Sequence, residues 1–289
     1  MIISIASGKG GTGKTTVAVN LALSLKNAQF LDCDVEEPNA HIFLKPRISG
    51  EKKASIPVPE VDKVKCTYCG KCRDICAYHA IAVLPANDNK KGSILTFPHL
   101  CHGCGACSLL CPQGAIKEIN QEIGAIEIGE KGDMQFIHGR LNIGEAMSPP
   151  LIRQVKEYIN ATRTVIVDAP PGTSCPVIMA VKGSDFCVLV TEPTPFGLND
   201  LILAVNVLRK LNIPFGVVIN RSDIGDGKVE DYCDKENIPI LMNIPFSREI
   251  AVGYSEGVPI VEKDASYRDK FVNLYTNICS IKNETNSRN

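Results

Sequence analysis

The sequence contains no tryptophan, and its aromatic residues make up only 6% of the 289 positions. This scarcity argues against the aromatic platforms on which proteins stack single-stranded nucleic acid. Charge of one sign is not in excess either, because 31 lysines and arginines face 32 aspartates and glutamates. The balance gives no electrostatic reason to expect binding to nucleic acid or to an anionic membrane.

Long apolar runs are also missing. No stretch approaches the roughly 20 residues needed to cross a bilayer, and the opening residues "MIISIA" lack the basic and apolar regions of an export signal. We therefore expect a cytoplasmic protein without membrane insertion. Because 44% of the residues are hydrophobic, the chain can bury the core of one large or two smaller domains.

Cysteine, by contrast, is abundant, with 13 residues. Eight of them lie in two dense groups, which in a reducing compartment point to metal binding rather than to disulfides. Four others lie in apolar strand or helix contexts and are expected in the core, namely Cys33, Cys187, Cys233 and Cys279. The last is Cys175.

Strand and helix patterns alternate at both ends of the chain. "MIISIA" predicts a strand, "TTVAVNLALSLK" a helix and "QFLDCD" a second strand, an order that implies parallel pairing. From residue 149 the alternation resumes with a helix at "PPLIRQVKEYI" and strands at "TVIVDAPPG", "FCVLVTEP", "FGVVIN" and "IPILMNIP". Such continuous Val, Ile and Leu runs are typical of strands buried on both faces of a parallel sheet.

The pattern is interrupted in the middle of the chain. "KPRISGEKKASIPVPE" is typical of a linker, the dense cysteines follow, and "GAIEIGEKGDMQFIHGRL" predicts a hairpin. We predict an α/β fold with a mostly parallel sheet, built from residues 1–57 and 119–282. A small insert occupies residues 58–118, and the polar residues 283–289 are expected to be disordered.

The first loop carries a phosphate-binding pattern. "GKGGTGKT" matches G-x-x-x-x-G-K-[ST] directly after a strand and before a helix. Glycines let backbone N–H groups surround phosphate oxygens, and the helix N-terminus adds a favourable dipole. Lys14 is expected at the β and γ phosphates and Thr15 on Mg²⁺. The predicted nucleotide-binding residues here are Gly8, Gly10, Gly11, Thr12, Gly13, Lys14, Thr15 and Thr16.

A second lysine, Lys9, lies within the loop, and "KGGTGKTT" resembles the deviant Walker A motif of the MinD/ParA-type ATPases. That group includes the nitrogenase iron protein and the Mrp-type iron–sulfur carriers. The resemblance implies a P-loop ATPase fold, Mg²⁺-dependent ATP hydrolysis to ADP, and a dimer of identical chains or with a related ATPase chain. It also makes Lys9 a catalytic lysine that reaches the partner's phosphates, a role that suits phosphoryl transfer. The alternative is a solvated surface lysine.

Three further segments resemble the same family. "LDCDVEEPN" resembles switch I, which implies that Asp34 orients or deprotonates the attacking water and that Asp32 supports Mg²⁺. "VIVDAPPG" resembles Walker B and switch II, with Asp168 on Mg²⁺ through water and Gly172 near the γ phosphate. Asn220, which ends "FGVVIN", resembles the adenine-reading asparagine, although asparagine is also common in turns. The implied catalytic residues are Lys9, Lys14 and Asp34.

The two dense cysteine groups share the spacing C-x2-C-x2-C-x3-C. The duplicated pattern resembles the bacterial two-cluster ferredoxins, which implies an inserted ferredoxin-like α+β domain with two [4Fe–4S] clusters. In those proteins the fourth cysteine of each motif reaches the other cluster. The resemblance assigns one cluster to Cys66, Cys69, Cys72 and Cys111, and the other to Cys76, Cys101, Cys104 and Cys107.

Two points stand against a simple match. Zinc is the rival metal, because C-x2-C pairs also form tetrahedral sites, although zinc seldom needs two tandem runs of four cysteines. The first motif also departs from the pattern, because Ala77 follows Cys76 where Pro112 follows Cys111. No ligand is lost by this departure, which leaves the stiffness of the turn in question.

Cys175 lies seven residues after Asp168. The nitrogenase iron protein carries a cluster-ligating cysteine at the same step, so the resemblance makes Cys175 a candidate ligand of a cluster at a dimer interface. No cysteine lies between residues 112 and 174, and two copies of Cys175 supply only half of such a ligand set. The alternative is a small half-buried side chain, which cysteine often is.

These features predict an ATPase in which nucleotide-driven dimer switching gates electron transfer through the two clusters to a partner protein. The alternative is an iron–sulfur cluster carrier or assembly ATPase that delivers a cluster to an acceptor protein. A positioning or partition ATPase is disfavoured, because "SYRDKFVNLYTNICSIKNETNSRN" has no strong amphipathic pattern for surface binding. Eight cysteines saturate two clusters, which favours permanent electron transfer over release of cargo.

Overall fold

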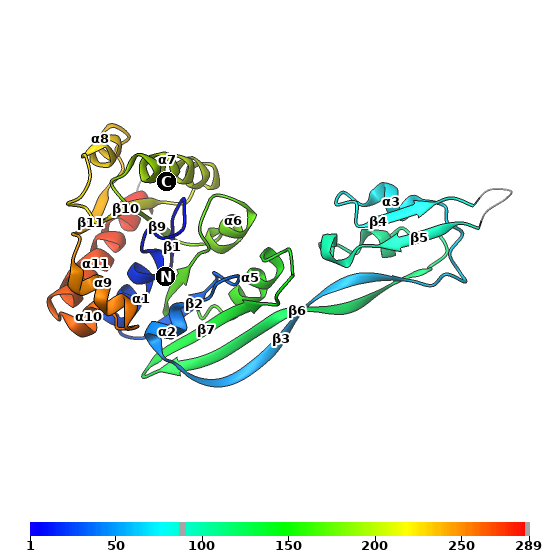
Figure 1. Cartoon of the computed structure of the whole chain (residues 1–289), viewed down its shortest axis with the longest axis horizontal. Coiled ribbons are helices and arrows are strands. Elements are labelled where there is room, and N and C mark those ends of the chain that lie inside the picture. The colour runs from blue at the N-terminus through cyan, green and yellow to red at the C-terminus, as the bar shows by residue number, and fades with distance from the viewer. Residues whose placement is uncertain (87–90, 287–289) are drawn as a thin grey trace. The chain divides into compact units, whose positions relative to one another are not determined.

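The computed structural model describes residues 1–86 and 91–286 and divides into two compact units (Figure 1). The second unit comprises Lys53–Ala125 and Leu141–Leu151, and the first unit comprises the rest of the chain. These limits differ from the predicted ones, because the second unit begins five residues earlier than 58, ends seven later than 118, and gains residues 141–151. Residues 53–57 and 119–125 belong to the long strands β3 and β6, whereas residues 142–151 form a loop and the start of α5.

One nine-stranded sheet has the order β11-β10-β9-β1-β8-β2-β7-β6-β3. Its central strands pair in parallel, as the apolar runs predicted. The strands are β1 (Ile2–Ala6), β2 (Ala28–Asp32), β3 (Arg47–Val61), β6 (Ile116–Lys131), β7 (Met134–Leu141), β8 (Thr164–Asp168), β9 (Phe186–Thr191), β10 (Phe215–Asn220) and β11 (Ile240–Ile244).

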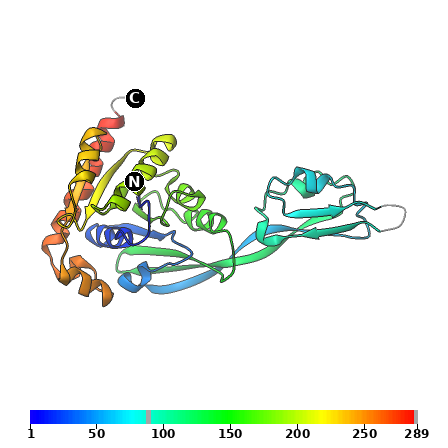
Figure 2. The same cartoon turned by 45° about the horizontal axis from the view of Figure 1, so that its top comes forward.

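The helices of the first unit pack against this sheet (Figure 2). Helix α1 contacts β8 and also the C-terminal helix α11, while α6 contacts β1 and α7 contacts β9. The helices are α1 (Lys14–Ser24), α2 (Ala40–Leu44), α5 (Pro149–Lys156), α6 (Cys175–Val181), α7 (Pro195–Leu211), α8 (Lys228–Lys235), α9 (Arg248–Ser255), α10 (Ile260–Lys263) and α11 (Ser266–Asn286).

The segment expected to be a linker forms strand β3 instead. Two ion pairs join β3 to β6: Arg47 pairs with Glu130 at 2.6 Å, and Lys53 pairs with Glu122 at 2.7 Å. Because the later residue of β3 pairs with the earlier residue of β6, the two strands run in opposite directions. The strand lies at the sheet edge, where proline is tolerated because no further strand needs its missing N–H. The prolines and lysines that suggested a linker are therefore edge-strand residues.

The predicted hairpin is present as β6 and β7. Only Gly132 and Asp133 separate the two neighbouring strands, so they must run antiparallel. Gly132 has φ +60°, a conformation that glycine adopts without strain. The hairpin places β7 beside β2 in parallel register, which positions the end of β2 for the site described below.

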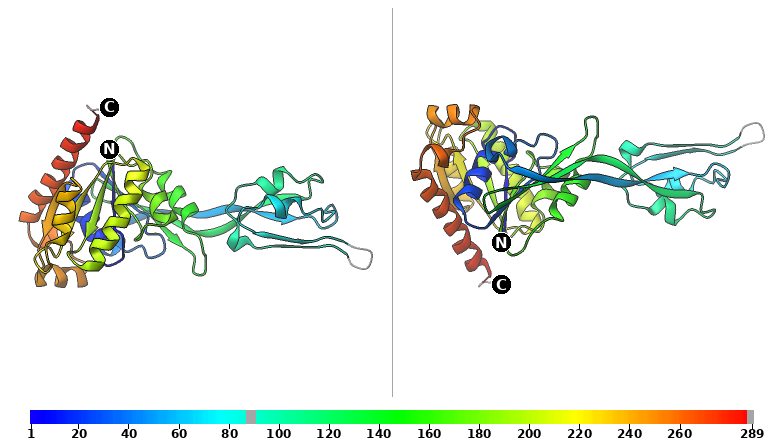
Figure 3. Two further views of the ribbon diagram at one scale, coloured as in Figure 1. Left: turned by 90° about the horizontal axis from the view of Figure 1, so that it is seen from above. Right: turned by 90° about the horizontal axis from the view of Figure 1, so that it is seen from below.

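The second unit carries its own small core, and its strands β4 and β5 run side by side in both views of Figure 3. Strands β4 (Ile81–Leu84) and β5 (Ser93–Thr96) pair antiparallel, and their residues Ile81, Val83 and Ile94 form the buried cluster. Helices α3 (Lys71–Ile75) and α4 (Ala106–Leu109) contact each other, and the 3₁₀ turn η1 (Pro98–Leu100) precedes the second cysteine group.

The expectation of disorder from residue 283 is wrong through residue 286. Helix α11 continues to Asn286, and residues 287–289 lie outside the described part of the chain. The helix is anchored by Phe271, Leu274 and Ile278, which are buried in the core shared with α1. Once a helix is formed, each added residue gains one backbone hydrogen bond. The anchored part of α11 can therefore be extended by the polar residues that follow it.

Candidate nucleotide site and paired cysteine cavities

The phosphate-loop sequence lies between β1 and α1, as predicted. Gly13 caps α1 with φ +91°, which strains any other residue. A Cβ atom at Gly13 would also lie 2.5 Å from Nδ2 of Asn220. That nitrogen donates a hydrogen bond to the carbonyl of Thr12 at 2.9 Å, so Asn220 holds the loop from the end of β10.

A cavity of about 360 Å³ adjoins the loop, a volume within the range of small-molecule sites. Its lining includes the predicted residues Gly10, Gly11, Gly13, Lys14, Thr15, Thr16, Asp34 and Asn220. Arg221, Phe246 and Tyr254 line it as well and were not expected from the sequence. Arg221 follows Asn220 directly, which is the one signal that could have identified it.

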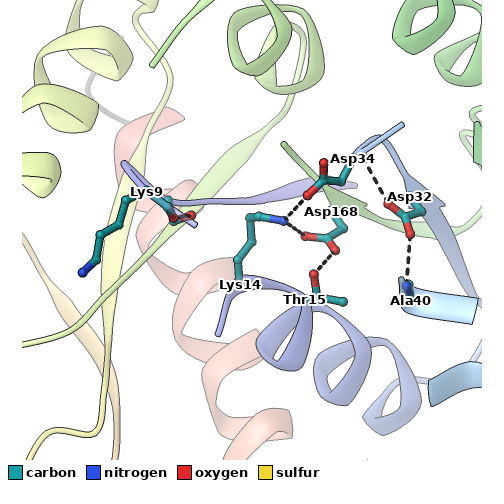
Figure 4. A network of polar contacts seen from close by, with 8 residues as sticks. Lys9, Lys14, Thr15, Asp32, Asp34, Ala40 and Asp168 are labelled. Carbon is teal, nitrogen blue, oxygen red and sulfur yellow. Dashed lines mark hydrogen bonds and ion pairs between the residues drawn. The ribbon is translucent and has the colours of Figure 1, made fainter. Parts of the chain in front are cut away.

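Two predicted aspartates lie side by side at the ends of β2 and β8. Asp32 and Asp168 are register partners, and both are fully buried. The Lys14 ammonium donates to Asp168 Oδ1 at 3.0 Å and to Asp34 Oδ2 at 3.3 Å (Figure 4). Thr15 Oγ1 donates to Asp168 Oδ2 at 2.6 Å. The structure therefore brings the predicted lysine, threonine and three aspartates into one network.

Asp32 holds the loop between β2 and α2. Its carboxylate accepts hydrogen bonds from the backbone N–H groups of Asp34 at 3.1 Å and Ala40 at 3.2 Å (Figure 4). Burial, with a further contribution from Asp168, raises the pKa of Asp32 well above its usual value. Burial likewise raises the pKa of Asp34 to about 6, although the Lys14 ammonium opposes the rise.

Lys9 lies apart from this network. Its ammonium is 3.7 Å from Glu192 of its own chain and points away from Lys14 (Figure 4). Glu192 is largely buried and also pairs with Arg221 at 2.8 Å. The sequence did not identify these two partners. Contact between Lys9 and the phosphates bound to a second chain stays a prediction. It requires the ion pair between Lys9 and Glu192 to break.

Switch II is tied to the phosphate loop. The backbone N–H of Gly172 donates to the carbonyl of Ser7 at 2.9 Å, and Gly172 has φ +99°.

At the far end of the following helix, α6, the Lys156 ammonium donates to three carbonyls, those of Met179, Ala180 and Lys182, at 3.1, 2.6 and 2.5 Å. This clamp on the C-terminus of α6 was not expected from the sequence.

The eight cysteines of the two C-x2-C-x2-C-x3-C motifs line two cavities in the second unit. One cavity is lined by Cys66, Cys69, Cys72 and Cys111. The other is lined by Cys76, Cys101, Cys104 and Cys107. The fourth cysteine of each motif therefore joins the first three of the other motif, which is the grouping that the ferredoxin resemblance implied.

The two halves of this unit share their backbone geometry. The N–H of Ala80 lies 3.3 Å from Cys76 Sγ, and the N–H of Ala115 lies 3.3 Å from Cys111 Sγ. The turn therefore forms in the same way whether Ala77 or Pro112 follows the cysteine. Equivalent residues also share positive φ, as in the pairs Tyr68 and Gly103, Gly70 and Gly105, and His79 and Gly114.

Burial and neighbouring thiols raise the pKa values of cysteines at these cavities. Burial raises the pKa of Cys107 to about 11, and the nearby thiols of Cys101 and Cys104 add to the rise. Burial also raises the pKa values of Cys72 and Cys101. Thiolates are the metal-binding form, so metal binding at these cavities would release protons. Within residues 1–86 and 91–286, no three His, Cys, Asp or Glu side chains are placed to hold a single metal ion.

The scattered cysteines differ from one another. Cys33, Cys187 and Cys233 are buried as expected, and Cys279 is half-buried. Cys175 is exposed at the first residue of α6, so it is not the half-buried side chain of the alternative interpretation. Its role as a ligand stays a prediction.

Comparison with known proteins supports the nucleotide site. Residues 3–260 match the family model described as the CobQ/CobB/MinD/ParA nucleotide binding domain. An uncharacterised protein of Methanocaldococcus jannaschii is 33% identical over 89% of this chain and 90% of its own length. An iron–sulfur cluster carrier protein of Pyrococcus abyssi is 25% identical over 90% of this chain and 78% of its own.

Among solved structures, the cell division ATPase MinD of Pyrococcus furiosus has a TM-score of 0.57 at 22% identity. The similarity covers 97% of this chain and 98% of that one. At this identity the likeness establishes the fold, a mostly parallel α/β sheet of the P-loop ATPase type. None of the helices in the described residues is long and apolar enough to cross a membrane.

Proposed function

Because the chain belongs to the CobQ/CobB/MinD/ParA nucleotide-binding family, we propose that it is an ATPase that controls iron–sulfur clusters. ATP and Mg²⁺ bind at the phosphate loop of the first unit, and two [4Fe–4S] clusters are held by the second unit. A bound cluster supplies one-electron chemistry. The active form is a dimer of identical chains or a pair with a related ATPase chain.

At the nucleotide site, each residue of the network has a role in this proposal. Lys14 leaves the carboxylates to contact the β and γ phosphates, and Thr15 with Asp168 holds Mg²⁺ directly or through water. Asp34 orients the attacking water, and Asp32 keeps the loop that carries Asp34 in place. Asn220 fixes the phosphate loop and faces the adenine side of the cavity. Lys9 acts on the partner's phosphates once it leaves Glu192.

The observation that carries the iron–sulfur part is the pair of cavities with four thiols each. The donor set fits the group, because all eight ligands are thiols and backbone N–H groups point at the sulfurs of Cys76, Cys101 and Cys111. The duplicated backbone geometry supports the same ligand at both cavities. Zinc is the competing occupant, and metal analysis separates the two.

Delivery of a cluster to an acceptor protein is the use that the comparisons support better than electron transfer, because named relatives are iron–sulfur cluster carrier proteins. In this use the exposed Cys175 at the start of α6 is the candidate site of a transferable cluster, next to switch II. Electron transfer is the second candidate. It is favoured by the two complete four-thiol cavities, which suit resident clusters rather than cargo.

One experiment separates the two uses. The anaerobically purified protein is loaded with iron and sulfide and mixed with apo-aconitase, with and without Mg²⁺-ATP, while iron in each protein is measured. Delivery predicts ATP-dependent activation of aconitase, which Cys175→Ser abolishes. Electron transfer predicts that iron stays in place while ATP changes the reduction potential of the clusters. If ATP affects neither, nucleotide control is wrong.

A further inference from the structure

The duplicated halves of the second unit differ in charge at matching positions. Around the first cysteine motif, four positions are cationic, and at the equivalent positions around the second motif all are uncharged. The cations are Lys63, Lys65, Lys71 and Arg73, and their counterparts are Pro98, Leu100, Ala106 and Ser108. Because the two halves share backbone geometry, the difference is one of side chains alone.

Two of the four cations are placed at the first cavity, and the other two precede its first cysteine in the sequence. Lys71 is part of the lining of that cavity, beside the cysteines. Arg73 folds back so that Nη1 is 3.3 Å from the carbonyl of Val83, which lines the same cavity. Lys63 and Lys65 are exposed just before Cys66. The cationic residues thus belong to the segment that carries the first cysteine motif, and Lys71 lies in the lining of its cavity.

Half of this charge is balanced by aspartates of the same segment. Arg73 pairs with Asp74 at 2.7 Å, and Lys65 approaches Asp62 at 3.9 Å. Lys63 and Lys71 form no ion pair with any residue that the structure describes. The segment 62–74 therefore carries four positive and two negative side chains, a net charge of +2.

The second cavity has the opposite character. Its lining includes the carboxylate of Glu118, whose counterpart in the other half is Val83. No lysine or arginine lies between Cys101 and Cys111. Its rim carries a stacked aromatic pair instead, Tyr78 and His102, with ring centroids 3.5 Å apart. A charged docking partner can therefore distinguish the two cavities.

An apolar side chain projects from the centre of the cationic segment. Val64 is 96% exposed and lies between Lys63 and Lys65. Exposed apolar side chains among like charges suit the small, transient interfaces of electron-transfer proteins, in which charge steers the encounter. Nucleic acid is the other anionic class, but its binding sites use several stacking aromatics, and Tyr68 is the single aromatic among the residues that line the first cavity.

We infer that an acidic electron-carrier protein docks on this basic segment, defined by Lys63, Lys65, Lys71 and Arg73, and exchanges electrons with the first cysteine site. The inference rests on the proposal that the second unit holds clusters. In the reducing direction one electron leaves the carrier's reduced flavin or iron centre, which is oxidised by one electron. The cluster held by Cys66, Cys69, Cys72 and Cys111 is reduced by that electron.

The test uses the loaded full-length protein and reduced flavodoxin, an acidic one-electron carrier without iron, as the probe. The variant Lys63→Glu/Lys65→Glu is compared with Lys210→Glu/Lys235→Glu, which changes the net charge equally on exposed positions of the first unit. Stopped-flow absorbance gives the rate constant for cluster reduction. At low salt we expect the first variant to be slower by roughly tenfold or more, and the gap to close at high salt as charges are screened.

The controls separate this inference from the proposed function. Reduction of both variants by excess dithionite to the same extent shows that the clusters are intact. If iron analysis finds no clusters, the proposed function fails. If clusters are present but the two variants react equally with flavodoxin at every salt concentration, the docking inference is overturned. Loss of binding to DNA-cellulose in the first variant without a change in flavodoxin rate would also overturn it, in favour of nucleic acid.

Discussion

The crossed ligand sets give a prediction about pairs of cysteines. Replacing Cys69 and Cys111 by alanine removes two ligands from one cavity and none from the other. Replacing Cys69 and Cys76 by alanine removes one ligand from each cavity. The two double variants lose the same number of thiols, so a nonspecific effect of cysteine loss is matched between them.

The expected iron contents follow from the geometry. Two [4Fe–4S] clusters correspond to about eight iron atoms per chain. The Cys69/Cys111 variant should keep about four, all in an intact [4Fe–4S] cluster, because its second cavity retains every ligand. The Cys69/Cys76 variant should keep no intact [4Fe–4S] cluster, because each cavity retains only three thiols.

Iron and sulfide analysis of anaerobically reconstituted protein, with EPR spectra before and after reduction, distinguishes these outcomes. Circular dichroism of each variant checks that the first unit remains folded. If the Cys69/Cys76 variant keeps one intact cluster while the Cys69/Cys111 variant keeps none, each motif holds its own cluster. The assignment of the fourth cysteine of each motif to the other motif's cluster would then be wrong.

Three further predictions concern the first unit. Lys14→Ala should lower the ATPase rate at least about hundredfold, because a charge at the transferred phosphoryl group is lost. It should also lower the free energy of unfolding by about 3–5 kcal/mol, because buried carboxylates lose their cation. Steady-state phosphate release measures the rate, and urea unfolding measures the stability. Lys156→Met should lower the free energy of unfolding by roughly 2 kcal/mol through the loss of three carbonyl contacts, and the exposed Lys182→Met is its control in the same urea titration. Asp34 has a pKa raised by burial to about 6, so the folded protein binds the extra proton and its stability, without nucleotide, falls as pH rises from about 4 to 6. Thermal unfolding of Asp34→Asn should lack this part of the slope, and an unchanged slope would contradict the assignment.

The parallel sheet and the nucleotide network could be predicted from the sequence because their signals are local. A strand, a glycine loop and a helix follow one another directly around Lys14, and apolar runs mark β8, β9 and β10. The grouping of cysteines was also expected, because the duplicated spacing resembles that of the two-cluster ferredoxins. The contacts between these segments, such as that of Lys14 with Asp168, join residues far apart in the chain, and the family resemblance implied them.

Features set by distant pairing could not be predicted. Strand β3 contains prolines and exposed lysines, and only its pairing with β6 at a sheet edge makes it a strand. The Lys9–Glu192 pair and the Lys156 clamp each join residues far apart in the sequence, and single lysines carry no signal of such partners. The polar composition at the C-terminal end of α11 predicts a disordered tail and gives no signal of a helix that Phe271 anchors in the core.

The central claim is that nucleotide bound in the first unit controls clusters held in the second. The most direct test is the EPR spectrum of the reduced, cluster-loaded protein during a potential titration, with and without Mg²⁺-ATP. The account predicts that ATP changes the midpoint potential or the amount of bound cluster in the wild-type protein, and changes neither in Lys14→Ala. Identical titrations with and without ATP in the wild-type protein would contradict it.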